Sequence, residues 1–94
     1  MTLNQEECEL LRLISLAAEP VAMSDFFHGI HPPNFPRSAA ADDPDREAWV
    51  ELQLGLYRAS ISLWKADLVR IVQPANGERP DLVEITDTGR TALA

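Results

Sequence analysis

The feature that most constrains the fold is a long helix pattern followed directly by two β-like runs. Apolar residues recur at helical spacing from Asp45 to about Leu68. The runs at 69–73 and 82–86 are rich in Val and Ile, and Asn76-Gly77 lies in the turn between them. The order helix, strand, turn, strand predicts an α+β fold in which a long helix leads into a β-hairpin.

Two shorter helices are expected before the long one. Apolar side chains at helical spacing predict a first helix over residues 3–18, with Thr2 or Asn4 as its cap, and Pro20 ends it. Ser24 and Asp25 are residue types that cap a helix N-terminus, so we expect a short second helix over 26–30. The small residues after the second strand form a final turn of helix or a fraying terminus.

A loop over residues 31–44 separates the second helix from the third. The run His31-Pro32-Pro33-Asn34-Phe35-Pro36 cannot continue a helix, because proline removes a backbone donor and restricts the residue before it. Asp43 and Pro44 then suit the N-cap and the first position of the long helix. Residues 1–94 are therefore predicted to form one domain of three helices and a C-terminal hairpin.

The long helix carries two apolar stripes on roughly opposite sides. The first stripe is Val50, Leu54, Tyr57, Ile61, Trp64 and Leu68, and the second is Trp49, Leu52, Leu56, Ala59 and Leu63. A helix that is apolar on both sides must be covered on both sides. We therefore expect a homodimer interface on the second stripe, formed by Trp49, Leu52, Leu56 and Leu63. The alternative is that the first helix covers one stripe and the hairpin the other.

The charge of the chain is acidic and unevenly distributed. The net charge is −7; residues 1–56 carry ten acidic and three basic side chains, whereas residues 57–94 carry five of each. An acidic surface disfavours phosphate contacts, but the neutral C-terminal half keeps them possible. No apolar run reaches the length of a membrane span, the first residues do not resemble a signal peptide, and the one cysteine, Cys8, cannot form an internal disulfide. We therefore expect no membrane partner and a cytoplasmic protein.

Two short motifs in the C-terminal half resemble the winged helix-turn-helix superfamily of transcription regulators. The motif Ile61-Ser62-Leu63-Trp64-Lys65-Ala66-Asp67-Leu68-Val69 is similar to the end of that family's recognition helix, with Asp67 at a position where glycine is common. The motif Ile85-Thr86-Asp87-Thr88-Gly89-Arg90 is similar to the segment after the wing in MarR- and PadR-like proteins. The resemblance covers about residues 45–94 and implies a winged helix with a long third helix.

The resemblance also implies a double-stranded DNA partner. In that family the recognition helix enters the major groove and the wing touches the backbone. Candidate groove residues are Arg58, Ser62 and Lys65, and candidate wing contacts are Arg70, Asn76 and Arg79. The alternative is that these side chains only solvate an exposed edge.

Two functions follow from these observations. The first is a non-enzymatic, DNA-binding transcriptional regulator that acts through the third helix and the wing. The alternative is an acidic winged-helix module for protein–protein interaction, such as an adaptor or a phage-type inhibitor of a DNA-binding protein. In that case the acidic N-terminal half contacts the partner.

No residue pattern predicts catalysis, a cofactor or a metal. His28 and His31 are close in sequence to Asp25, but zinc normally takes three or four protein ligands, and Cys8 is distant in sequence. The glycines are isolated, so no phosphate-binding loop is expected. We therefore expect no enzyme activity.

Overall fold

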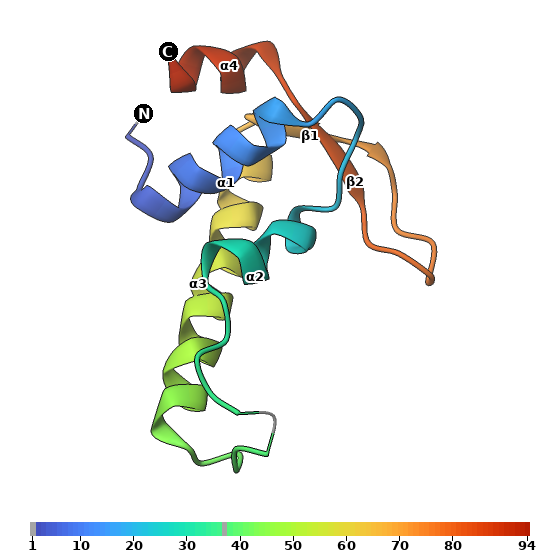
Figure 1. Ribbon diagram of the computed structural model, residues 1–94. Coiled ribbons are helices and arrows are strands. Elements are labelled where there is room, and N and C mark those ends of the chain that lie inside the picture. Colours follow the sequence, from blue (N-terminus) through green and yellow to red (C-terminus); the bar gives the residue numbers. More distant parts are fainter. Residues whose placement is uncertain (1, 37) are drawn as a thin grey trace.

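The computed structural model describes residues 2–36 and 38–94, which form an α+β fold (Figure 1). Its helices are α1 (Gln5–Leu16), the 3₁₀ turn η1 (Met23–Phe26), α2 (Phe27–Ile30), α3 (Pro44–Lys65) and α4 (Asp87–Leu93). Its strands are β1 (Val69–Gln73) and β2 (Leu82–Ile85), which pair antiparallel. The long third helix and the hairpin agree with the sequence prediction. The described residues contain four α-helices rather than three, because the segment after the hairpin is helical.

Side-chain caps determine where α1 and α3 begin. The Asn4 side chain accepts a hydrogen bond from Glu7 N at 2.7 Å, and Glu7 in turn accepts one from Asn4 N, which is a capping box. The Asp43 carboxylate accepts from the backbone N–H groups of residues 45 and 46, and Pro44 is the first helical residue. The predicted start of the long helix is therefore confirmed.

The predicted cap of the second helix is wrong. Ser24 and Asp25 lie inside η1, and neither η1 nor α2 has a side-chain cap. Ala22 is the N-cap of η1, and it is buried. Burial of Ala22 decides where this turn starts, whereas the side chains of Ser24 and Asp25 are exposed.

Helix α3 ends in a backbone geometry that glycine adopts most easily. Asp67 has a φ of +62°, and Leu68 N donates to Leu63 O while Asp67 N donates to Trp64 O. These two bonds form a Schellman motif, in which the residue after the C-cap is left-handed. The left-handed backbone at position 67 is the physical reason why a glycine would suit this position. The geometry also turns the chain directly from α3 into β1.

Strand β2 is paired on both sides near its buried end. Val69 pairs with Ile85 and Ile71 with Val83, and an irregularity follows between Ile71 and Gln73. On the other side, Val21 and Val83 exchange two backbone hydrogen bonds of 2.8 and 3.0 Å. The segment between α1 and η1 is thereby fixed to the hairpin.

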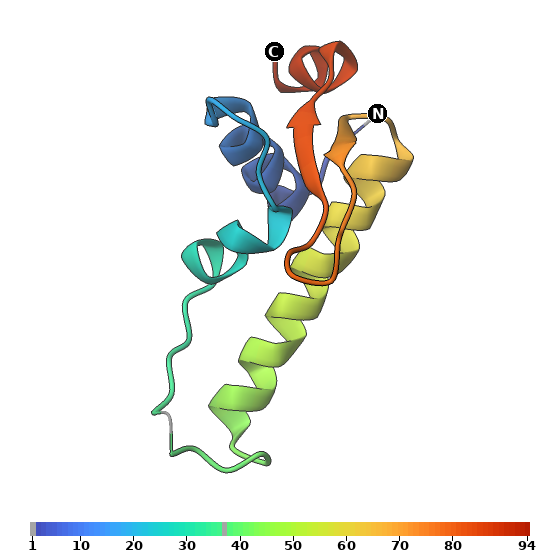
Figure 2. The ribbon, with the colours of Figure 1, turned by 90° about the vertical axis from the view of Figure 1, so that its right-hand side faces the viewer.

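The core lies where α1, the C-terminal half of α3 and the base of the hairpin meet. Its buried members are Leu10, Leu11, Ile14, Leu63, Leu68, Val69 and Val83. The N-terminal half of α3 projects beyond this core, accompanied by the described loop residues 31–36 and 38–43 (Figure 2). Within the described ranges, no helix has both the length and the apolar character to cross a bilayer.

The Thr-x-x-Gly motif after β2 fixes α4 to the end of α3. Thr86 donates its hydroxyl proton to Asp67 O at 2.6 Å and accepts from Gly89 N at 3.0 Å, which caps α4. A Cβ at Gly89 would overlap the Leu68 carbonyl oxygen and lie 2.7 Å from an Ile85 side-chain carbon. The glycine is therefore required by close approach of two backbone segments.

We predict that Asp67→Gly stabilises the protein and Asp67→Ala destabilises it. A left-handed conformation costs a residue with a Cβ about 1–2 kcal/mol, part of which Asp recovers by local hydrogen bonding. Glycine removes this cost but adds unfolded-state entropy, so the net gain is about 0.5 kcal/mol. Urea unfolding of the three proteins measures the difference, and equal stability of the Gly and Ala variants would contradict the assignment.

Candidate functional site

An exposed apolar surface runs along one side of α3. Its members, called the α3 apolar face below, are Val50, Leu54, Tyr57, Ile61 and Trp64. The side chains of Tyr57 and Trp64 are 57% and 51% exposed, Val50 and Leu54 are each 41% exposed, and Ile61 is half-buried. At 3.6 residues per turn these positions lie within an arc of about 80°. A contiguous exposed apolar surface of this kind marks a site of interaction.

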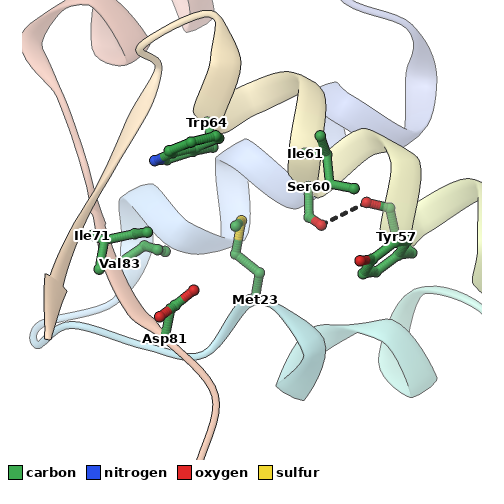
Figure 3. Close-up of a pocket in the computed structure, with 8 residues that line it drawn as sticks. All are labelled: Met23, Tyr57, Ser60, Ile61, Trp64, Ile71, Asp81 and Val83. Carbon is green, nitrogen blue, oxygen red and sulfur yellow. Dashed lines mark hydrogen bonds between the residues drawn. The ribbon is translucent and has the colours of Figure 1, made fainter. Parts of the chain in front are cut away.

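A shallow groove joins the C-terminal end of this face to the hairpin. The groove has a volume of about 260 Å³ and is lined by Met23, Tyr57, Ser60, Ile61, Trp64, Ile71, Asp81 and Val83. Met23 reaches into it from η1, between the α3 side chains and the strands (Figure 3). Two of its polar side chains already form hydrogen bonds, since Ser60 donates to Tyr57 O and Asp81 accepts from Ala75 N, both at 2.6 Å, and most of the remaining lining is apolar. The groove is therefore suited to apolar groups.

A polar edge borders the α3 apolar face. It consists of Glu47, Glu51, Arg58, Ser62 and Lys65, all exposed. The three predicted groove residues thus lie on one edge of α3, as the helical spacing requires. With the other described residues, the charged members of this edge form no ion pair. The edge is acidic toward the start of the helix and basic toward its end.

The three predicted wing contacts are already bonded within the hairpin. Arg70 forms an ion pair with Glu84 on the opposite strand. The Asn76 side chain accepts from the N–H groups of residues 78 and 79, which shapes the turn. Arg79 donates to the carbonyl oxygens of Pro74 and Pro80 and to the Gln73 side chain. These contacts give all three residues a structural role and reduce the free positive charge of the wing.

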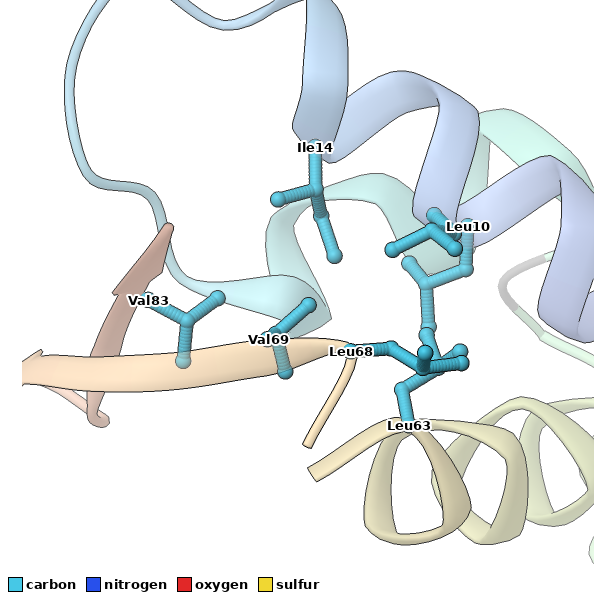
Figure 4. Close-up of a cluster of buried hydrophobic side chains, with 7 residues drawn as sticks. Leu10, Ile14, Leu63, Leu68, Val69 and Val83 are labelled. Carbon is cyan, nitrogen blue, oxygen red and sulfur yellow. The ribbon is translucent and has the colours of Figure 1, made fainter. Parts of the chain in front are cut away.

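Two of the predicted dimer residues are buried inside the single chain. Leu56 and Leu63 have 0% exposed surface, and Leu63 packs beside Leu10 and Leu68 (Figure 4). The prediction that they form an interface is wrong, because α1 covers this side of α3. Leu52, one turn earlier, is 45% exposed.

Trp49, the fourth predicted interface residue, holds the loop against α3. Its indole N–H donates to His31 O at 2.8 Å, and its ring makes edge-to-face contacts with His28 and Phe35. Gln53, one turn later, also donates to His31 O, at 3.1 Å. The first part of the loop, residues 31–35, is thus docked on α3.

The two stripes of α3 differ in the kinds of side chain that they carry. The buried side consists of aliphatic leucines, and Gly55 leaves room for Glu6 of α1. The exposed side contains Tyr57 and Trp64, whose polar groups tolerate contact with water. Trp49 on the second stripe is also amphipathic but is half-buried under the loop, so aromatic content alone does not identify the exposed stripe.

The described residues contain no group of three His, Cys, Asp or Glu side chains that could hold a metal ion. His31 instead approaches Glu6 of α1, with 3.6 Å between Nε2 and Oε2. Gly55 makes room for this carboxylate, since a Cβ there would lie 2.9 Å from Glu6 Oε2. The contact connects the loop to both α1 and α3, which is a structural role.

We predict that Trp49→Phe loosens the loop without changing the oligomeric state. The variant loses one hydrogen bond, worth about 0.5–1.5 kcal/mol, and keeps an aromatic ring. Hydrogen exchange of residues 31–43 should become faster, whereas the α1 amides should not change. A change in mass in solution with unaltered loop exchange would instead restore Trp49 to an interface.

Comparison with known proteins identifies no relative. No family model, curated protein or solved structure matches the chain. A proposal for its function therefore depends on its own residues.

Proposed function

We propose that this chain is a non-enzymatic protein–protein interaction module that binds its partner through the α3 apolar face. The observation that carries the proposal is the exposure of Tyr57 and Trp64 with three aliphatic neighbours on one side of a regular helix. Aromatic residues are enriched at protein interfaces and at their energetic centres, whereas charged residues are depleted there. A helix also presents them with little loss of conformational freedom on binding.

The position of α3 makes this face accessible. Its N-terminal half projects beyond the core (Figure 2), the loop is bonded to Trp49, and Tyr57 is 57% exposed. The molecule measures 43 Å along its longest axis, and α3 spans about 33 Å at 1.5 Å per residue. A partner can therefore contact most of the helix without displacing any described element.

We further propose a winged-helix arrangement for the module. The order of α1, α2 and α3 followed by a hairpin supports it, and the bridge between Val21 and Val83 adds the segment after α1 to the sheet. Two features depart from a compact helix-turn-helix. Helix α2 has only four residues, and thirteen residues separate it from α3.

Charge favours a protein partner over DNA. The net charge is −7, and the wing cations Arg70 and Arg79 are bonded within the hairpin. DNA binding requires several free cations on one surface. One observation still favours DNA as a second candidate: Arg58 and Lys65 are exposed on the same edge of α3 as Ser62.

A photo-reactive amino acid at position 57 tests the main proposal. In cells of the source organism, benzoylphenylalanine in place of Tyr57 should form a covalent product with a second polypeptide, because this side chain lies at the centre of the face. The same group at Leu16, an exposed apolar residue on α1, is the matched control. Absence of any product at position 57, or equal yields at both positions, would contradict the proposal.

Fluorescence anisotropy with mixed-sequence duplex DNA tests the second candidate. Under the main proposal we expect no binding at low salt. Binding that weakens with salt, and that Arg58→Glu reduces by about tenfold or more, would support DNA instead. Arg12→Glu on α1 is the control, since it makes the same charge change on an exposed residue away from α3.

A further inference from the structure

The charged border of the α3 apolar face reverses its sign near the middle of the helix. Glu47 and Glu51 precede the midpoint, and Arg58 and Lys65 follow it. At about 100° per residue, these four positions lie within an arc of about 40° next to the apolar face. The surface is therefore an apolar strip with one charged side, acidic at one end and basic at the other.

Such a surface is complementary to its own copy in one orientation. A two-fold axis perpendicular to two antiparallel helices places the same edge of each helix together and reverses its direction. Glu51 then lies within one turn of Arg58 of the second copy, and Glu47 lies within one turn of Lys65 of that copy. Each pair occurs twice by symmetry.

The same axis brings apolar residues together. With the axis between Leu54 and Tyr57, Leu54 faces Tyr57 of the second copy and Val50 faces its Ile61. The two faces overlap from Val50 to Ile61, which is about 17 Å at 1.5 Å per residue. Exposed apolar side chains of both helices leave water over this length, which is the main driving force for association.

We infer that the α3 apolar face binds a second copy of this chain, with the two α3 helices antiparallel. The inference rests on the proposed function, because it names the partner of the same surface. A two-fold axis parallel to the helices would place the polar edges of the two copies on opposite sides of the interface, so the acidic and basic residues of this edge would not pair. The net charge of −7 on each copy opposes association, but salt screens it beyond about 8 Å, farther than the distance between the paired side chains.

The inferred dimer has a consequence for the second candidate function. Arg58 and Lys65 would be paired with Glu51 and Glu47 of the second copy. The basic part of the polar edge would then be unavailable to phosphate groups. Self-association and DNA binding at this edge of α3 therefore exclude each other.

Two opposite charge reversals provide the sharpest test. Glu51→Lys and Arg58→Glu each replace an attractive pair by a repulsive one, and they do so twice per dimer. By sedimentation velocity, each variant should self-associate at least about tenfold more weakly than the unmodified chain. An equimolar mixture of the two variants should recover the affinity, because a heterodimer of these chains again places opposite charges at both contacts between positions 51 and 58.

Recovery on mixing is a result that a fold defect in either variant would not produce. The Arg12→Glu chain is the control and should associate like the unmodified protein. The inference is overturned if the unmodified chain is monomeric up to about 1 mM, where even weak pairs associate. It is also overturned if mixing restores nothing.

The cross-linking experiment separates this failure from that of the proposed function. If the chain alone is monomeric and position 57 cross-links to a different polypeptide, the proposed interaction module is supported and the inferred self-association is overturned. A product of twice the chain's mass supports both. No product at all overturns both.

Discussion

The packing of α1 against the C-terminal half of α3 is the contact on which the rest of the structure depends. It buries Leu63 with Leu10 and Ile14, and it leaves no exposed surface on Leu56. Full burial of each leucine contributes about 1.5–3 kcal/mol. Because α1 occupies this side of α3, the opposite apolar side is covered only in part, among the described residues, by the short hairpin and by Met23 of η1. The exposure of Tyr57 and Trp64 is therefore a consequence of how the core is filled.

The length of α3 relative to the core explains why the loop docks on its N-terminal half and why the hairpin and α4 gather at its C-terminal end. The 22-residue α3 is longer than the core, so its N-terminal half needs its own cover. The loop supplies it through Trp49 and His31, with Gly55 admitting Glu6 of α1. At the other end, the left-handed Asp67 and the Thr86 hydroxyl fix the hairpin and α4 to the same helix. One helix thus organises two small, separate sets of contacts.

Local signals in the sequence predicted the local structure well. Asp43 and Pro44 fixed the start of α3, Asn76-Gly77 lay in the hairpin turn, and Asn4 was one of two residues expected to cap α1. The Ser24 cap was wrong because burial of Ala22, a tertiary effect, decides where that turn begins. Arg70 and Arg79 were predicted to contact DNA from the wing, or else to solvate an exposed edge. Their partners within the hairpin could not be predicted from the sequence, since cross-strand register and turn geometry create those contacts.

A long helix with two apolar stripes followed by a hairpin could be predicted from the residues alone, because helical periodicity and turn residues act over a few positions. Which stripe joins the core depends on how the elements pack. Two stripes of similar hydrophobicity are equivalent until another element packs on one of them. Gly55 leaves room for Glu6 of α1 on one side of α3, and the amphipathic rings of Tyr57 and Trp64 tolerate water on the other. The assignment of surface and core thus follows from long-range packing, which sequence periodicity does not encode.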